Sequence, residues 1–433
     1  MNVSASTPSV SLIRNPEFLK FWVGQTISAF GSQITNLALP LTAVLVLNAS
    51  SSQMGVLNAL GVLPFMLVGL FAGVWVDRMR RRPILIAADL GRFVLLGSIP
   101  LAALGGFLTI PYLYVAIFLI GVMTVFFDVS YQSFLPSLVG REQLVEGNSK
   151  LEVSASAAGI LGPGLAGVLV QTLTAPIAIL FDAISFLVSA ISLRLIHSEE
   201  IAPERSQETP QNMLREIREG LSVVFGNRLL WSIAGCTATS NLFGSMLQAV
   251  FILYLTRELH VPPAVQGIIF AAGAPGALLA ALFSARVTKR FGLGTSIIGA
   301  AFLGMASSLP VIFVVDASLL STVILVLVLF VGSFSFVLYN VNQVSLRQAI
   351  TPDRLLGRMN ASMRFLVWGT VPIGSLIGGF LGDAIGLRPT IILSVTLGLW
   401  SFLWVFFSPV RHLKEIPTPA IPAPAQPIAP AAE

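Results

Sequence analysis

The chain alternates between long apolar stretches and short polar connections. Each apolar stretch reaches about 20 residues, the length that a helix needs to cross the hydrocarbon core of a bilayer. Membrane-barrel strands are much shorter, and in lipid a helix satisfies its own backbone groups. The pattern predicts an all-α integral membrane protein with twelve transmembrane helices, at 18–47, 54–76, 84–104, 111–138, 150–172, 176–196, 229–255, 264–285, 293–314, 319–345, 361–382 and 389–408.

The composition agrees with a lipid environment. Of the 433 residues, 55% are hydrophobic and only 10% are charged, whereas soluble proteins carry roughly 25% charged residues. If both termini are cytoplasmic, all of the 25 Lys and Arg residues except Arg257 and Arg388 fall on the cytoplasmic side. This distribution follows the positive-inside rule. It predicts a multi-pass protein of the plasma (inner) membrane and explains the basic charge without a nucleic-acid partner. The first seventeen residues are polar, so we expect no removable signal peptide.

Similar motifs recur at matching positions in the two halves of the chain. The segment "SFLPSLVGREQLVEGN" at 133–148 resembles "SLRQAITPDRLLGRMN" at 345–360, and a proline opens the sixth span of each half. We therefore expect two pseudo-symmetric six-helix bundles, a repeat that is typical of transporters. The predicted organisation is a cytoplasmic segment at 1–17, bundles at 18–196 and 229–408, a linker at 197–228, and a disordered Pro/Ala-rich cytoplasmic tail at 409–433.

The linker at 197–228 has a polar first part and an amphipathic second part. Leu214, Ile217, Leu221 and Val224 recur at helical spacing, opposite charged residues. This spacing predicts a helix lying on the cytoplasmic face of the membrane. A solvated linker helix is the alternative.

Two short motifs carry a resemblance to a known superfamily. The segment "GVWVDRMRRRP" at 73–83 matches the fingerprint Gly-x-Leu-x-Asp-Arg-x-Gly-Arg-Lys, with Trp75 and Arg80 as departures, through Gly73, Asp77, Arg78, Arg81 and Arg82. The segment "GPGLAG" matches the span-five fingerprint of antiporters through Gly162, Pro163 and Gly167. On these motifs the sequence resembles the major facilitator superfamily, in the branch of macrolide-efflux and enterobactin-export proteins.

The resemblance implies that the two bundles rock around a central cavity. It also implies that the fingerprint after span two is a conformational switch, in which Asp77 steadies the outward-open state. We expect Asp77 to approach the start of span eleven, where helix N–H groups and Arg364 favour an anion. Retention of the connection on the cytoplasmic side is the alternative role of its arginines.

By the same resemblance, spans one, four, seven and ten line the cavity. Their polar residues are therefore the candidates for substrate contact: Gln25, Gln33, Asn36, Asn241, Gln248, Tyr339 and Asn340. Amides with few charges suit a substrate with little fixed charge. Hydrogen bonding between helices is the alternative role for each of them.

Two carboxylates inside the predicted spans are candidates for proton coupling. An acid in the membrane costs about 2.5–3.5 kcal/mol on insertion scales, so it usually faces protein or water. Asp128 lies in span four and Asp182 in span six. Asp89 and Arg92 in span three could extend the charge network of Asp77 and the arginines that follow span two. The resemblance also shows a departure, because span four lacks the arginine that many proton-driven exporters of the superfamily carry there. A structural hydrogen bond or ion pair is the alternative for both candidates.

The motifs of energy-consuming enzymes and metal sites are missing from the sequence. It contains neither a phosphate-binding GxxxxGK[ST] loop nor an HExxH motif, and its three histidines are far apart. We therefore expect no nucleotide, metal or cofactor, and a proton gradient as the energy source.

These patterns predict a secondary active transporter that acts by alternating access. The expected activity is proton-coupled efflux of a small amphipathic molecule, such as a drug, a macrolide-like compound or a siderophore. A facilitator or a lipid or metabolite transporter without proton antiport is the alternative, and a membrane sensor or enzyme is a remote one. The expected partners are the small-molecule substrate and the lipid bilayer, and a monomer is expected.

Overall fold

The computed structural model describes residues 12–76, 78–197 and 213–415. In the N-terminal half the helices are α1 (Pro16–Leu41), α2 (Ser51–Leu67), α3 (Gly69–Val76), α4 (Arg81–Leu104), α5 (Ile110–Val139), α6 (Leu144–Thr172) and α7 (Ala175–Arg194). In the C-terminal half they are α9 (Arg228–Leu253), α10 (Pro263–Ala271), α11 (Gly273–Phe291), α12 (Leu293–Ala306), α13 (Leu319–Ile350), α14 (Asp353–Trp368), α15 (Thr370–Ile385), α16 (Leu387–Leu399) and α17 (Leu403–Phe406). Between the halves lies α8 (Met213–Gly226).

The predicted transmembrane architecture is confirmed. Within the described ranges, eleven helical segments are long and apolar enough to cross a membrane, and the shorter apolar helix α2 supplies the remaining span together with α3. Between α2 and α3 the helix is interrupted at Val68, one turn after Pro64. The N–H that proline lacks would bond to the carbonyl of the preceding turn, so Pro64 does not by itself account for a break at Val68, whose N–H bonds to the Pro64 carbonyl.

The two halves repeat unusual details of the backbone. Both α1 and α9 end in a five-residue π turn, Thr42–Val46 and Tyr254–Glu258. Each turn is followed by a residue with positive φ, Asn48 (52°) and His260 (54°). A residue with a side chain rarely adopts this conformation, so its recurrence at the same interval supports a common origin of the halves.

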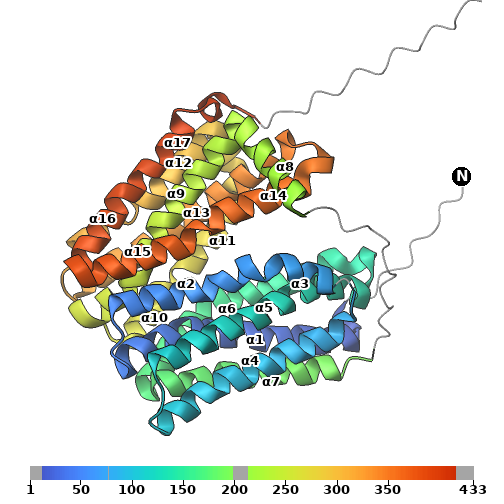
Figure 1. Cartoon of the computed structure of the whole chain (residues 1–433), viewed down its shortest axis with the longest axis vertical. Coiled ribbons are helices and arrows are strands. Elements are labelled where there is room, and N and C mark those ends of the chain that lie inside the picture. The colour runs from blue at the N-terminus through green and yellow to red at the C-terminus, as the bar shows by residue number, and fades with distance from the viewer. Residues whose placement is uncertain (1–11, 77, 198–212, 416–433) are drawn as a thin grey trace, which may run out of the picture.

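Positions of basic residues define two sides of the molecule. We call the side with the helix ends near Arg82, Arg290 and Arg347 the basic side, and the side with the connections 47–50 and 259–262 the opposite side. In Figure 1 the halves touch where α2 lies beside α15, and their ribbons diverge toward α3 and α14. The packing between helices agrees, because α2 packs against α15 and α6 against α10.

Glycines bring the backbones of the two halves together on the opposite side. A Cβ added to Gly55 of α2 would lie only 2.4 Å from the carbonyl oxygen of Ser375 in α15. By contrast, nothing lies within 4 Å of the Cβ positions of Gly69 and Gly73, toward the basic end of the same span. The halves are therefore closed on the opposite side and separated on the basic side.

The amphipathic linker helix is present, but its described part contacts protein. α8 packs against α14, and a Cβ on Gly220 would lie 2.4 Å from the carbonyl oxygen of Arg358. Glu219 forms an ion pair with Arg358, and Val224 is fully buried. The helix α8 is therefore attached to the C-terminal half, and its place on the membrane face stays a prediction.

The predicted terminal boundaries also shift. The backbone N–H groups of Leu293 and Gly294 donate to the carbonyl oxygens of Lys414 and Leu413, at 3.0 and 2.8 Å. The chain therefore stays attached to α12 beyond residue 409, where the predicted tail begins. In the predicted N-terminal segment, Leu12 is buried and its N–H donates to Glu146 Oε1 at 3.1 Å. The rest of the two terminal segments, 1–11 and 416–433, lies outside the described residues.

Candidate functional site: cavities between the two halves

A cavity of about 670 Å³ lies between the halves, and we call it the N-side cavity. Its walls come from α1, α2, α5 and α6 of the N-terminal half and from α9 and α10 of the C-terminal half. Gln33 and Asn36 of α1 line it, and so does Gln248 of α9. Apolar side chains such as Phe65 and Phe270 make up much of the remaining wall.

A larger cavity of about 980 Å³ lies against the C-terminal half, and we call it the C-side cavity. Its walls come mainly from α9, α13 and α14, with Val62 of α2 facing them. Asn241, Tyr339 and Asn340 line it. Gln248 lines both cavities, so the two cavities adjoin and form one candidate substrate site.

Hydrogen bonds fix the polar wall of the C-side cavity. The Tyr339 hydroxyl lies 2.8 Å from Thr237 Oγ1, which itself donates to the Ile233 carbonyl at 2.8 Å. Because Thr237 has one proton to give, Tyr339 is the donor between the two hydroxyls. Asn241 Nδ2 donates to the Val367 carbonyl at 3.2 Å and so joins α9 to α14. These residues combine the two roles that the sequence left open, since they line a cavity and also bond across helices.

Gln25 is the candidate that the structure places elsewhere. Its Nε2 donates to Ser189 Oγ of α7 at 3.0 Å, and it is not among the residues lining either cavity. We therefore reassign Gln25 to contact between α1 and α7. The difference lies along the helix rather than around it, because Gln25 lies only about 20° from the cavity-lining Asn36 around the axis of α1 but roughly 16 Å nearer the start of the helix, where Ser189 of α7 is its partner.

A buried arginine organises the candidate acids. Arg92 of α4 is 5% exposed and forms an ion pair with Asp89, which is completely buried. The guanidinium lies over the rings of Phe127 and Phe186, at 4.2 and 4.1 Å from their centroids. Aromatic faces stabilise a desolvated cation. Arg92 counts toward the cytoplasmic charge in the sequence, and the structure shows it buried between helices inside the third span.

Asp128 and Asp182 both act electrostatically on Arg92 but differ in accessibility. Asp182 is 1% exposed; its Oδ1 accepts a hydrogen bond from Ser185 Oγ at 3.0 Å. Asp128 is exposed, and the charges that act on it are Arg92 of its own half and Arg364 of the other half. The fourth span, α5, thus has no arginine of its own, but Arg92 of the neighbouring helix α4 acts on the carboxylate of Asp128.

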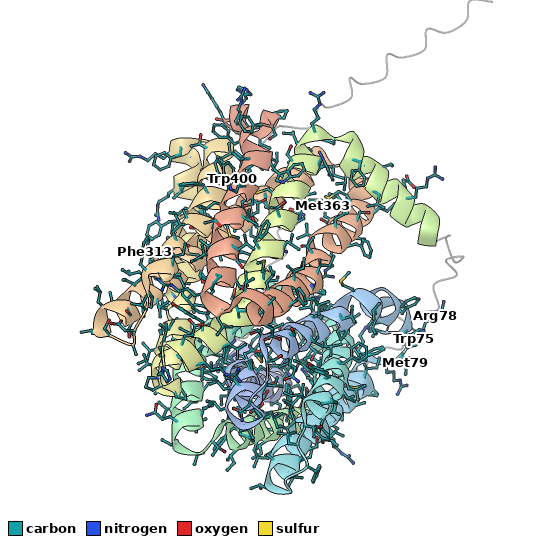
Figure 2. The ribbon with its side chains drawn as sticks, turned by 60° about the vertical axis from the view of Figure 1, so that its left-hand side comes forward. Trp75, Arg78, Met79, Phe313, Met363 and Trp400 are labelled. Atoms are coloured by element: carbon teal, nitrogen blue, oxygen red, sulfur yellow. The ribbon has the colours of Figure 1, made fainter. Side chains whose placement is uncertain are left out.

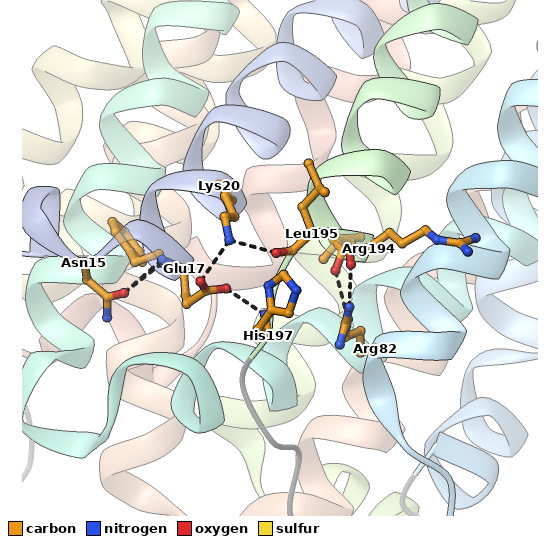
Figure 3. A network of polar contacts seen from close by, with 9 residues as sticks. Asn15, Glu17, Lys20, Arg82, Arg194, Leu195 and His197 are labelled. Carbon is orange, nitrogen blue, oxygen red and sulfur yellow. Dashed lines mark hydrogen bonds and ion pairs between the residues drawn. The ribbon is translucent and has the colours of Figure 1, made fainter.

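Residues of the fingerprint after span two have distinct surroundings. Arg82 Nε and Nη2 donate to the carbonyls of Leu193 and Arg194 at 2.8 and 2.6 Å, so Arg82 binds the C-terminal end of α7 (Figure 3). Arg78 is exposed at the free end of the N-terminal half, together with Trp75 (Figure 2). Arg81 is half-buried at the start of α4.

The switch contact expected of Asp77 stays a prediction, because Asp77 lies outside the described residues. Its predicted neighbour Arg364 lines the C-side cavity, and Gly73 has open space at its Cβ position.

The antiporter-type motif of α6 lies at the contact between helices. A Cβ on Gly162 would lie 2.5 Å from Gln33 Cβ of α1, and one on Gly167 would lie 2.4 Å from the carbonyl oxygen of Pro263. In return, a Cβ on Gly267 of α10 would lie 2.3 Å from the Pro163 carbonyl oxygen. The motif therefore allows α6 to touch both the cavity-lining helix α1 and the other half.

Two polar contacts between the halves have no counterpart among the predictions from sequence. Asp383 at the end of α15 accepts hydrogen bonds from Ser50 Oγ, Ser51 N and Ser52 N, at 3.0, 2.8 and 2.9 Å. Gln171 Oε1 of α6 accepts one from Ala264 N of α10 at 3.1 Å. Each contact caps the N-terminus of a helix in the other half, where backbone N–H groups lack intrahelical partners. We call these two contacts the cross-half caps.

Only a weak sequence signal points to the cross-half caps. Ser50 and Gln53 form a capping box, which marks the start of α2 but not its partner across the interface.

Metal binding finds no support in the described ranges, since no group of three or more His, Cys, Asp or Glu side chains that could hold a metal ion occurs there.

Comparison with known proteins agrees with this architecture. The model of a family described as transmembrane secretion effector, within the major facilitator superfamily, matches residues 7–431. The chain belongs to this family. The superfamily resemblance is thereby confirmed, and with it the prediction of a multi-pass membrane transporter rather than an enzyme.

Two similar proteins are named for efflux. The multidrug efflux pump Tap of Mycolicibacterium fortuitum is 29% identical over 92% of this chain and 97% of its own length. Macrolide efflux protein A of Streptococcus pyogenes is 26% identical over 88% of this chain and 93% of its own length. A bacterial homologue of the iron transporter ferroportin, solved in an inward-facing state, superimposes with a TM-score of 0.69 at 18% identity, covering 92% of this chain and 100% of that one. This last likeness shows a shared fold.

Proposed function

We propose that this transporter exports an amphipathic small molecule across the plasma membrane, with both termini and the basic side in the cytoplasm. The charge distribution supports the orientation, since 23 of the 25 Lys and Arg residues fall on that side by sequence. One of the 23, Arg92, is buried between helices rather than exposed in a connection. In this orientation the structure is inward-facing. Substrate then reaches the cavities from the cytoplasm or the inner leaflet.

The observation that carries the proposal is a cavity whose walls belong to both halves. The N-side cavity is lined by helices of each half, and the halves touch on one side only. Rocking of the halves around such a site would close the basic side and open the opposite side. Alternating access by rigid-body movement of repeats is the established behaviour of this architecture.

Proton coupling is the second part of the proposal. A proton shifts an equilibrium between two states only if it binds them with different affinity. Asp128 meets this condition, because Arg364 acts on it from the other half and their separation changes when the halves move. Protonation of Asp128 removes an attraction across the opening. Asp182 would hold its proton in a place without direct access to solvent, so we assign the exchanging proton to Asp128.

The relatives guide the substrate class and the energy source. Relatives named for multidrug and macrolide efflux cover nearly the whole chain, and the cavities combine apolar walls with amides. We propose export of a drug, a macrolide-like compound or a siderophore, driven by the proton gradient without a bound cofactor or nucleotide, by a monomer.

Transport into inverted membrane vesicles tests this function. Uptake of a panel of dyes, macrolides and siderophores is compared between vesicles with the wild type and vesicles without it, in the presence and absence of a protonophore. We expect uptake of at least one compound that the protonophore abolishes and that Asp128→Asn uncouples from the pH gradient. If uptake is the same with and without the protonophore, the protein is instead a facilitator.

A further inference from the structure

The charged residues of the C-side cavity are all of one sign. Arg347 of α13 and Arg364 of α14 line it, and among the described residues neither this cavity nor the N-side cavity has an Asp or Glu in its wall. In the sequence both arginines count toward the positive charge of the cytoplasmic side, and the amides predict a substrate with little fixed charge. Two arginines without an acid in the cavity wall instead favour a substrate with a negative charge.

Arg347 is held in place by burial rather than by an acid. It is half-buried, and its Nε is a buried donor without a hydrogen-bond partner in the described ranges. The adjacent Gln343, 3% exposed, has a buried Oε1 that is likewise unpartnered within those ranges. Unpaired polar atoms in a protein interior are uncommon because each costs about 1–3 kcal/mol. A ligand group that bonds to Arg347 would remove part of this cost.

Arg364 lies deeper along the same wall. It lies nine residues, or roughly 13 Å along the helix axis, after Leu355 near the basic end of α14. An ionised side chain that lines a cavity between transmembrane helices usually marks a pathway or a binding site. Arg364 takes part in no ion pair among the described residues; the acid that acts on it, Asp128, belongs to the other half.

We propose that the C-side cavity binds the anionic group of an amphipathic substrate, with Arg347 and Arg364 as its cationic contacts. Guanidinium groups bind carboxylate, sulfonate or phosphate oxygens through charge-assisted hydrogen bonds. The apolar part of the substrate lies against Phe336 and Trp368, which line the same cavity. Its volume of about 980 Å³ is at the upper end of the usual range for drug-sized ligands. The inference rests on the proposed function and narrows its substrate class.

A matched pair of fluorescent probes tests the inference by binding alone. Anilinonaphthalene sulfonate and the same anilinonaphthalene without its sulfonate differ in one anionic group. Each is titrated into the purified full-length protein in one detergent, so that partition into the micelle cancels between variants. The variants are Arg347→Gln, Arg364→Gln and the two combined. Arg290→Gln is the matched control, since Arg290 is exposed on the basic side and lines neither cavity.

We expect the combined variant to bind the sulfonate probe at least tenfold more weakly than the wild type. This corresponds to the loss of charge-assisted hydrogen bonds, at about tenfold per 1.4 kcal/mol. Affinity for the uncharged probe should change less than about twofold, and Arg290→Gln should match the wild type with both probes. Arg364→Lys should restore part of the affinity, because it keeps the charge but not the planar fork.

Three results would overturn the inference. They are equal loss of both probes in the combined variant, an equal effect of Arg290→Gln, and a wild type that binds the sulfonate probe no more tightly than the uncharged one. A thermal melt shows whether the combined variant is folded. If it is not, the inference is tested by the affinities of both probes for Arg364→Gln alone, because Arg364 is exposed. Because binding needs no gradient, absence of transport in vesicles would contradict the proposed function without affecting this outcome.

Discussion

Removing the Asp383 cap should open the opposite side of the molecule. The carboxylate accepts three hydrogen bonds from Ser50, Ser51 and Ser52 of the other half. When the halves separate on this side, water replaces Asp383 at these donors. The substitution Asp383→Ala therefore destabilises only the state that the structure shows, and it shifts the equilibrium toward the state open on the opposite side.

The size of the shift follows from the geometry of the cap. A hydrogen bond to a charged group contributes about 1.5–3 kcal/mol net, and an N-cap about 1 kcal/mol. Asp383 is exposed, so water competes for the carboxylate and the sum of three bonds would overestimate the effect. We expect about 1.4 kcal/mol, which is about tenfold in the equilibrium constant. A wild-type population of about 1% open would rise to about 9%.

The distance distribution between two spin labels measures the fraction of molecules that are open on the opposite side. Phe107 of the N-terminal half and Phe313 of the C-terminal half are exposed on the opposite side. The single native cysteine, Cys236, is buried, so cysteines introduced at these two positions can be labelled selectively. Asp383→Ala should enlarge the long-distance population, and Asp383→Asn should give a smaller increase because one acceptor oxygen remains.

A control acid lies on the same side. Asp316 accepts hydrogen bonds only from Ser318 and Ser321 of its own half within the described ranges, so Asp316→Ala should leave the distance distribution unchanged. An unchanged distribution in Asp383→Ala would refute the reasoning. So would an equal change in Asp316→Ala, since it would show that negative charge on this side matters rather than the cap.

The remaining predictions concern other contacts of the same interface and the buried charge. Gln171→Ala removes one neutral hydrogen bond, worth about 0.5–1.5 kcal/mol, and should shift the same label pair in the same direction but less than Asp383→Ala; a larger shift would contradict this ranking. Gly267→Ala places a methyl group 2.3 Å from the Pro163 carbonyl oxygen in this state only, so the labels should report opening, and an unchanged distribution would count against contact between the backbones. Arg92→Gln leaves Asp89 buried without its cation, which typically costs about 3–5 kcal/mol, and should lower the melting temperature by several degrees; an unaltered melt would show that the ion pair adds little to stability.

The twelve spans were predictable because each segment must satisfy the hydrophobic requirement of a bilayer separately. Eleven segments are long and apolar enough by themselves, and α2 falls short because its span is interrupted one turn after Pro64. Six of the seven cavity candidates also lie in cavity walls. Their placement depended on the spans to which they belong, which the superfamily resemblance supplied.

Other features depend on contacts that a local pattern does not contain. Asp383 and Gln171 find their partners across the interface between halves, far away in the chain. The place of Gln25 depends on its position along α1, where Ser189 of α7 is its hydrogen-bond partner. In the sequence, Arg92, Arg347 and Arg364 resemble the other charges that set the topology. Only the packed structure reveals that Arg92 is buried between helices and that Arg347 and Arg364 line the C-side cavity.

The central claim is that the halves move around a shared site, so that one side closes as the other opens. Two label pairs measured under the same conditions test it most directly: Phe107 with Phe313 on the opposite side, and Met79 with Phe291 on the basic side, all of them exposed. In proteoliposomes, a change that opens one side, such as Asp383→Ala, should lengthen the first distance and shorten the second in the same fraction of molecules. Distances that lengthen together, or a second distance that stays constant while the first changes, would contradict alternating access by this chain.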